Sequence, residues 1–173
     1  MTDRRRTILG IDPGIGLLGY GVIEQNGQLV HVEHGAIATP ATDSTPMRLH
    51  TIYRALTELK RCYSVTDVAM EKLYFARNVT TAVAVGQARG VALLATVDAD
   101  TEFGEYMPTE IKQAVAGHGG AKKRQIQDMV QLILGLPTLP VPDDAADALA
   151  VAICHANRAT LAAVIAASGG VAR

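Results

Sequence analysis

The sequence predicts an α/β domain with a mixed β-sheet and helices packed on its faces. Three observations predict it: a hairpin signal near the N-terminus, segments of helical period that alternate with short apolar runs, and a composition suited to one core. The chain has 173 residues, of which 49% are hydrophobic and 19% are charged. Charged residues usually make up about 25% of a domain, so this chain can fill a sizeable core. We expect a single domain over residues 1–173, with its core at about 7–157 and a short C-terminal helical tail.

Three antiparallel strands are expected to open the fold. Residues 7–12 (TILGID) form a short apolar run that ends at the turn pair Pro13-Gly14. Two β-rich runs follow, LLGYGVIEQ and QLVHVEHGAIAT. They flank Asn26-Gly27, which is the strongest short-range hairpin signal in the chain.

A crossover helix is predicted to place a fourth strand beside the first. Apolar residues recur with a helical period over residues 46–63. The run VTDVAMEKL follows and is typical of a buried strand, which we expect to end near Glu71. A helix between two such strands delivers the second one parallel to the first.

The remaining segments continue the alternation of helices and strands. Residues 78–97 are mostly small and apolar with helical character, and TEFGEYM has the pattern of a short strand closed by Pro108. Helices are predicted over 108–116 and 121–134, separated by the loop GHGG. After the linker LPTLPVP, a last Ala-rich helix is expected to begin at about Asp143. This order of elements favours a mixed sheet covered by helices.

The charge balance argues against the simplest signature of a nucleic-acid-binding domain. Sixteen basic residues face 17 acidic ones, for a formal net charge of −1, whereas such domains often have a pI above about 9. The charge is nevertheless uneven along the chain. Residues 72–97 hold bases without acids, and residues 98–105 hold acids without bases.

The cellular setting is predicted from cysteine content and hydropathy. Two cysteines are too few for a disulfide framework and are typical of a reducing cytosol. Residues 145–167 are apolar enough to raise the question of a membrane span, but Asp147, His155 and Arg158 inside this stretch would be costly in a bilayer. We expect a cytoplasmic protein that does not bind a membrane.

Four carboxylates stand out as candidate metal ligands. Asp12 ends the first strand, Glu71 ends the strand expected beside it, and sites tend to be built at such strand ends. Asp144 and Asp147 are three residues apart in the first turn of the last helix, so they share one face. Oxygen donors without nearby His or Cys suit Mg²⁺ or Mn²⁺. Two such ions, about 3.5–4 Å apart, would activate a water for phosphodiester hydrolysis.

Each of these acids also has an ordinary structural explanation. Asp12 could be a turn residue before Pro-Gly, and Asp143, Asp144 and Asp147 could be acids of the kind favoured at helix starts. Glu71 is the most informative, because it lies in the apolar context VAMEKLYF, where a buried unpaired carboxylate is costly.

Basic and aromatic side chains in two places are candidates for DNA contacts. Tyr74 and Phe75 open the acid-free segment, which also contains Arg77. A second basic group lies around the GHGG loop: Lys112, Lys122, Lys123 and Arg124. Such side chains hold phosphates, and stacking on an exposed aromatic contributes roughly 1–3 kcal/mol per base. Solvated helix charges and core packing explain the same residues nearly as well.

Three longer stretches carry a family resemblance. They are ILGIDPGIGLLGYGVI, MEKLYFARNVTTAVAVGQARGVAL and DDAADALAVAICH, which occur in this order between about residues 7 and 157. On these motifs the chain resembles the RuvC family of bacterial crossover junction endodeoxyribonucleases, the Holliday junction resolvases. The resemblance implies a ribonuclease-H-like fold, with a mixed five-stranded sheet and helices on both faces.

The resemblance also implies an activity and its cofactor. It implies a homodimer that nicks two opposing strands of a four-way junction symmetrically in homologous recombination and DNA repair, leaving 5′-phosphate and 3′-hydroxyl ends. It places the catalytic and metal-binding acids at Asp12, Glu71, Asp144 and Asp147, with Asp143 as a helix cap. Two Mg²⁺ ions per subunit are implied, with Mn²⁺ as a substitute, as is cooperation with the RuvA–RuvB branch-migration complex.

Further roles follow from the same resemblance. Lys112 and Lys123 fall at basic positions that the family uses near the scissile phosphate, so Lys123 is also expected to be catalytic. Tyr74 takes the place of an aromatic residue that stacks on junction bases, where many members have Phe. Bound to two Mg²⁺ ions, the chain would change its formal charge from −1 to +3, so we expect DNA binding to depend on the cation. The expected DNA-binding residues are Tyr74, Phe75, Arg77, Lys112, Lys122, Lys123 and Arg124.

Two other functions are open at this point. An actin-like ATPase half shares the fold and opens with a similar acid-and-glycine strand, but two halves are needed to enclose a nucleotide and 173 residues supply one. A catalytically inactive junction-binding protein is the other alternative. The full set of carboxylates disfavours it, because they repel DNA unless a metal occupies them.

Overall fold

A mixed sheet of five strands forms the centre of the protein, as the sequence predicts. The computed structural model describes residues 5–72 and 79–168. The strands lie in the order β3-β2-β1-β4-β5. The first three are antiparallel neighbours, and β4 and β5 run parallel to β1. Their bounds are β1 (Arg6–Asp12), β2 (Leu17–Asn26), β3 (Gln28–Ala38), β4 (Asp67–Glu71) and β5 (Glu102–Tyr106).

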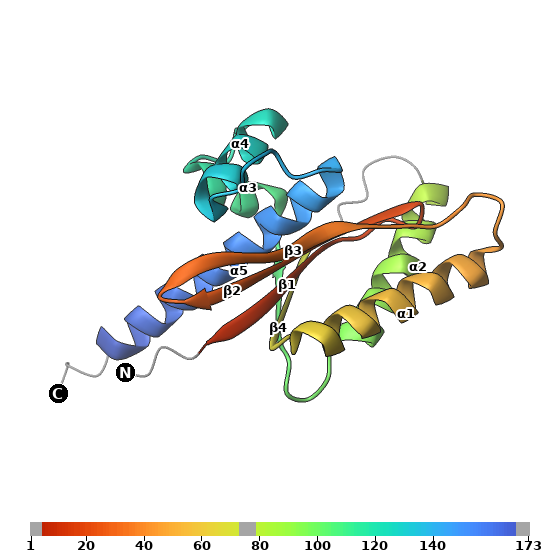
Figure 1. Cartoon of the computed structure of the whole chain (residues 1–173), viewed down its shortest axis with the longest axis horizontal. Helices are drawn as coiled ribbons and strands as arrows, with labels where there is room; N and C mark the ends of the chain where they lie inside the picture. Colours follow the sequence, from red (N-terminus) through yellow and green to blue (C-terminus); the bar gives the residue numbers. More distant parts are fainter. Residues whose placement is uncertain (1–4, 73–78, 169–173) are drawn as a thin grey trace.

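Helices cover both faces of this sheet, which confirms the predicted class (Figure 1). On one face lie α1 (Thr45–Tyr63) and α2 (Val79–Thr96), which pack against each other. On the other lie α3 (Pro108–Ala116), α4 (Lys123–Leu134) and α5 (Asp143–Ser168). Each face therefore has its own hydrophobic core, one around Ile52 and Leu56 of α1 and one around Leu149 and Ile153 of α5.

The strand assignments follow directly from burial and turn chemistry. The side chains from Thr7 to Ile11 are buried because β1 is a central strand covered on both faces, which explains its continuous apolar run. Gly27 turns the β2–β3 hairpin with a φ of 72°, a conformation that favours glycine. β4 joins β1 in parallel through the predicted crossover helix.

The start of α4 differs from the sequence prediction, whereas the helical character of the C-terminal tail agrees with it. Helix α4 begins at Lys123 rather than at residue 121, because Lys122 is its N-cap, and the Lys122 backbone N–H donates to Oε1 of Gln125 at 2.9 Å. Helix α5 runs unbroken to Ser168, so the predicted C-terminal tail is a continuation of the helix that carries the candidate acids.

Helix α5 lies unusually close to the sheet. A Cβ atom on Gly10 would overlap the carbonyl oxygen of Ala148, and one on Gly19 would overlap the carbonyl oxygen of Asp144. Only hydrogen fits at these two positions. The glycines of β1 and β2 therefore allow the first turn of α5 to rest on the strands that carry the site.

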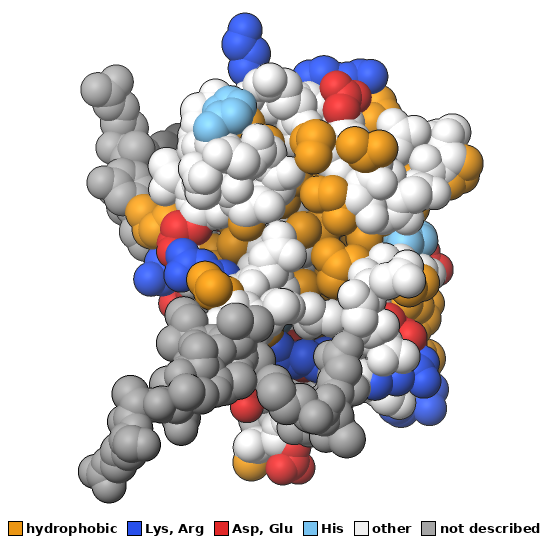
Figure 2. Space-filling view, turned by 90° about the vertical axis from the view of Figure 1, so that its left-hand side faces the viewer, with side chains coloured by type: hydrophobic (Ala, Val, Ile, Leu, Met, Phe, Trp, Pro, Cys, Tyr) orange, Lys and Arg blue, Asp and Glu red, His pale blue; other side chains and the backbone are white. Residues whose placement is uncertain are grey.

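The charge segregation seen along the sequence does not persist in space. Arg89 of the acid-free segment pairs with Glu105, and Lys60 of α1 pairs with Asp98. Figure 2 views the molecule from the left-hand side of Figure 1, and this surface likewise shows acidic and basic side chains intermixed around a band of hydrophobic ones. Within the described part of the chain, no helix is long and apolar enough to cross a membrane.

Candidate active site

Two strand ends and the first turn of α5 meet at one edge of the sheet. Ile11 of β1 pairs with Met70 of β4 in parallel register, so Asp12 and Glu71 follow at neighbouring positions. Asp12 also pairs with Gly19 of β2, and the backbone of Asp144 lies directly over Gly19. The sheet register and the close approach of α5 thus bring the predicted acids together.

The electrostatics of Asp12 show how closely these acids are grouped. Burial and then the negative charges of Asp147, Glu71 and Asp144 raise the pKa of Asp12 to about 7, against a weaker opposing effect of Lys123. Carboxylates that disfavour one another's ionised form in this way provide strong attraction for a cation.

Glu71 responds to the same surroundings. Burial, followed by the charge of Asp147, raises its pKa, whereas Lys112 lowers it. A carboxyl with an upward pKa shift at a strand end is the signature of a site rather than of a solvated surface acid. The upward shift of the Glu71 pKa therefore supports its assignment to the cluster of acids.

The donor set fits a hard divalent cation by its chemistry. All four candidate ligands are carboxylates, which suit Mg²⁺ and Mn²⁺ better than zinc. Among residues 5–72 and 79–168, however, no three His, Cys, Asp or Glu side chains are close enough to form a ready-made ligand cluster. The fit of the site to a cation therefore rests on the chemistry of its donors.

Lys123 connects α4 to the acids of α5. Its ammonium lies 3.1 Å from Oδ2 of Asp147 and 3.3 Å from Oδ2 of Asp143. Partial burial lowers the pKa of Lys123, but the hydrogen bonds and charges of Asp147 and Asp143 outweigh it and raise the pKa overall. Lys123 is thus charged and directed at the site, as expected of a catalytic cation.

Asp143 and Gln127 form a second link between the same helices. The Gln127 side chain donates to Oδ1 of Asp143 at 2.9 Å, while Lys123 contacts the other oxygen. The Asp143 carboxylate therefore bonds to α4, whereas the sequence suggested a cap of its own helix. Sequence reasoning missed Gln127, although its position one turn after Lys123 was a signal that both side chains share a face.

A cleft of about 270 Å³ opens beside the acids. Its polar lining consists of two acidic residues, Glu71 and Asp147, and two basic residues, Lys112 and Lys123. The apolar part of its lining is Pro108, Ile111, Ile126 and Ala150. A cleft in which two cations face two anions can hold a phosphate group next to bound metal.

Of the other predicted DNA-binding residues, two are exposed at the start of α4 and three lie outside the described residues. Lys122 is exposed at the start of α4, and Arg124 is exposed but pairs with Asp128 through Nε and Oδ1 at 3.0 Å. Tyr74, Phe75 and Arg77 lie outside the described residues. Of the predicted basic group, the structure thus places Lys112 and Lys123 in the cleft and the other two on the outer surface of α4.

Comparison with known proteins gives a consistent set of relatives. The sequence profile of the family described as crossover junction endodeoxyribonuclease RuvC matches residues 8–155. A protein of that description from Rubrobacter xylanophilus is 54% identical over 156 residues, which cover 90% of this chain and 87% of the relative.

Solved structures agree with the sequence comparison. Thermus thermophilus RuvC superposes with a TM-score of 0.82 at 36% identity, covering 90% of this chain and 96% of that one. A structure of T. thermophilus RuvC in complex with a Holliday junction substrate matches with the same TM-score at 32% identity, over the same shares of the two chains.

Proposed function

The chain belongs to the RuvC family of crossover junction endodeoxyribonucleases, and from this premise we propose that it resolves four-way DNA junctions by metal-dependent nicking of two opposing strands. The observation that supports this most strongly is the grouping of Asp12 with Glu71, Asp144 and Asp147: burial, together with the negative charges of these three acids, raises the pKa of Asp12 to about 7. An inactive junction-binding protein does not explain why four carboxylates gather beside the cleft, and an ATPase half would need a second half to enclose a nucleotide.

Divalent cations are the proposed partners of these acids. Asp12, Glu71, Asp144 and Asp147 would hold two Mg²⁺ ions per subunit, with Mn²⁺ as a substitute, because four carboxylates suit small hard cations. When bound, such ions lower the pKa of a coordinated water and stabilise charge on the entering and leaving oxygens. Family membership supports products with 5′-phosphate and 3′-hydroxyl ends.

The chain's own cations complete the proposed chemistry. Lys112 and Lys123 line the cleft from α3 and α4, where a scissile phosphate would lie beside the acids. An ammonium there stabilises negative charge that develops on the phosphoryl oxygens, typically by about 3 kcal/mol for a well-placed donor. Lys123 also holds the Asp147 carboxylate from the α4 side and thereby orients it.

Exposed bases next to the cleft are proposed to bind the DNA backbone. Lys122 and Arg124 project from the start of α4, one residue on either side of Lys123. Contacts of this kind position the duplex without reading its sequence. Tyr74, Phe75 and Arg77 remain proposed contacts on the strength of the family resemblance.

A homodimer is proposed because a four-way junction with two equivalent cleavage sites matches a two-fold symmetric enzyme. Helix α2 offers a suitable face: Val83 is 58% exposed and Leu94 is 76% exposed, and the exposed Gly90 between them allows close approach of a second helix. Family membership also supports cooperation with the RuvA–RuvB branch-migration complex and a cytoplasmic location.

One experiment tests the function and separates it from the alternatives. Purified protein is incubated with a synthetic four-way junction labelled on each strand, with and without Mg²⁺, beside an ATP hydrolysis assay. Paired, ligatable nicks on opposing strands that require Mg²⁺ and disappear in Asp12→Asn support the proposal. Junction binding without nicks would instead support the inactive binding protein, and ATP hydrolysis without nicks would support the ATPase half.

A further inference from the structure

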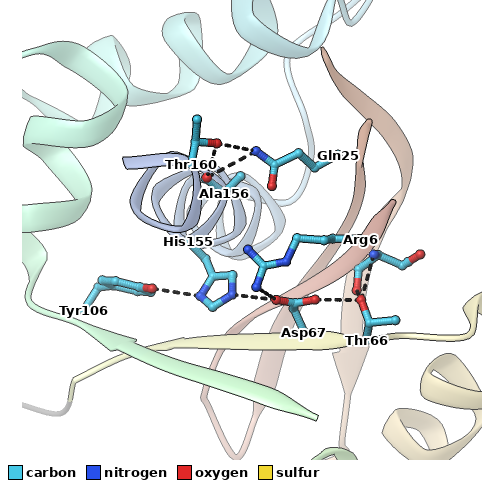
Figure 3. Close-up of polar contacts among 9 residues, drawn as sticks. Arg6, Gln25, Thr66, Asp67, Tyr106, His155, Ala156 and Thr160 are labelled. Atoms are coloured by element: carbon cyan, nitrogen blue, oxygen red, sulfur yellow. Dashed lines mark hydrogen bonds and ion pairs between the residues drawn. The ribbon is translucent and has the colours of Figure 1, made fainter. Parts of the chain in front are cut away.

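A chain of buried polar side chains crosses the protein near the start of β1 and β4, away from the acids (Figure 3). Nε2 of His155 on α5 lies 3.1 Å from Oδ1 of Asp67, and its Nδ1 lies 2.8 Å from the Tyr106 hydroxyl. Arg6 and the hydroxyl of Thr66 bond to Asp67 at 2.6 Å each. His155 is 6% exposed and Asp67 is 1% exposed, so the contacts lie in the interior.

Asp67, Tyr106 and His155 each have a defined role as donor or acceptor in these contacts. Burial raises the pKa of Asp67, but bonds from His155 and Thr66 and the charge of Arg6 outweigh it, so the carboxylate is ionised and accepts. Burial raises the pKa of Tyr106 to about 12, so its hydroxyl donates. Nε2 of His155 then donates to Asp67, and Nδ1 accepts from the Tyr106 hydroxyl.

Helix α5 and strand β4, which carry His155 and Asp67, also carry proposed metal ligands. His155 follows Asp147 by eight residues, about 12 Å along a helix. Asp67 precedes Glu71 by four residues, about 13 Å along a strand. Since the two spacings match, α5 and β4 meet at two levels: His155 bonds to Asp67 at one, and Asp147 and Glu71 line the same cleft at the other.

Between these two levels, α5 comes closest to the sheet at small residues. Ala148 and Ala152 of α5 lie over Gly10 of β1. Small residues allow this close packing, and because hydrophobic burial is non-directional, hydrogen bonds add to the axial positioning that packing provides. A shift by one residue would move α5 by about 1.5 Å and turn it by about 100°, which would carry Asp147 away from the site. Directional bonds at His155 oppose this shift.

Gly104 of β5 makes room for the contact between helix and sheet. A Cβ atom there would lie 2.6 Å from Nδ1 of His155 and would also crowd the Tyr106 hydroxyl. Tyr106 in turn pairs with Glu71 in the sheet, and its carbonyl accepts from the Lys72 backbone N–H at 2.9 Å. His155 is therefore connected to the strand end at Glu71 through Tyr106 as well as through Asp67.

We propose that His155 is a positioning residue for the nuclease reaction: by its bonds to Asp67 and Tyr106 it fixes the register of α5 on β4, and so places Asp147 opposite Glu71. It acts through the helix and touches neither DNA nor metal. The inference rests on the proposed function, because it takes the carboxylates to be the ligands of divalent cations.

The test measures Mn²⁺ binding to the protein alone, from the electron paramagnetic resonance signal of free Mn²⁺. His155→Leu removes both bonds, and we expect at least tenfold weaker binding. His155→Gln retains a donor at the position of Nε2, and we expect binding within about threefold of the unaltered chain. His155→Asn is too short to reach Asp67 and should resemble the leucine variant if the bond to Asp67 sets the register.

A matched control separates positioning from general loss of stability. Leu56→Ala opens a cavity in the α1 core on the other face of the sheet, where Leu56 is fully buried, so it lowers the unfolding temperature without touching α5. We expect its Mn²⁺ affinity to be unchanged when all variants are measured well below their unfolding temperatures. Junction affinity without divalent cations should be the same in every variant.

The outcomes are distinguishable. Weakened Mn²⁺ binding in His155→Leu and His155→Asn, with near-normal binding in His155→Gln and Leu56→Ala, supports the positioning role. Equal binding by all variants, or the same loss in Leu56→Ala as in His155→Leu, overturns it. An unaltered chain that binds no Mn²⁺ overturns the proposed metal site itself, which is a different result from normal binding in the His155 variants.

Discussion

Replacing Asp12 by asparagine should stabilise the protein in the absence of metal while abolishing cleavage. The pKa of Asp12 is raised from 3.8 to about 7, so the folded state binds this proton more tightly than the unfolded state does. Folding is therefore favoured at low pH, and the benefit is lost as pH rises from about 4 to about 7. The difference between the two pKa values corresponds to about 4 kcal/mol. Because asparagine does not ionise, the variant does not undergo this decrease in folding stability as the pH rises.

The measurement is urea-induced unfolding of both proteins in EDTA at pH 4, 6 and 8. We expect the stability of Asp12→Asn relative to the unaltered chain to increase by about 4 kcal/mol between pH 4 and pH 8, with most of the change above pH 5. Added Mg²⁺ should then stabilise the unaltered chain and leave the variant unchanged, by mass action. A stability difference that is the same at all three pH values would refute the account of Asp12 as a carboxyl held in a cluster of acids.

Three further predictions concern the support of the site, its cation and the proposed dimer. Gly19→Ala forces α5 off the sheet at Asp144, so we expect a loss of about 1–3 kcal/mol in urea unfolding together with loss of junction cleavage; normal cleavage would show that the close approach is dispensable. Lys123→Met removes a charge that lowers the pKa of Asp12, so the pH–rate profile for cleavage should move to higher pH and the maximal rate should fall roughly 100-fold; an unmoved profile would contradict this. Leu94→Asp should convert a dimer to a monomer in light scattering after size-exclusion chromatography, and a persistent dimer would place the interface elsewhere.

The sequence predicts the fold well because each element carries a local signal. The Asn26-Gly27 turn, the apolar run of β1 and the helical period of α1 are all legible over fewer than twenty residues. The candidate acids were also predictable, since Asp12 and Glu71 end adjacent strands and the parallel register that joins β1 to β4 follows from the crossover. Local signals and topology together thus give both the sheet and the edge at which the site lies.

Contacts that depend on distant partners were not predictable in the same way. The segment 72–97 reads as a basic surface, but Arg89 pairs with Glu105, a residue of the acidic segment that follows, because β5 brings the two together. Asp98 of the same acidic segment likewise forms an ion pair with Lys60 of α1. Neutralisation across elements is a property of the fold, so charge runs along a chain overestimate the charge of a surface.

The contact between His155 and Asp67 shows the same limit most clearly, because the two residues are 88 positions apart. In the sequence His155 was the last residue of the stretch DDAADALAVAICH and a polar residue that argued against a membrane span. In the structure it lies on the helix that carries Asp147 and meets the strand that carries Glu71. Candidate catalytic acids can be found from local motifs, but the bonds that join their helix to their strand become visible only when the two are packed together. The proposed metal site, assembled from separate elements, therefore depends on contacts that its motifs do not reveal.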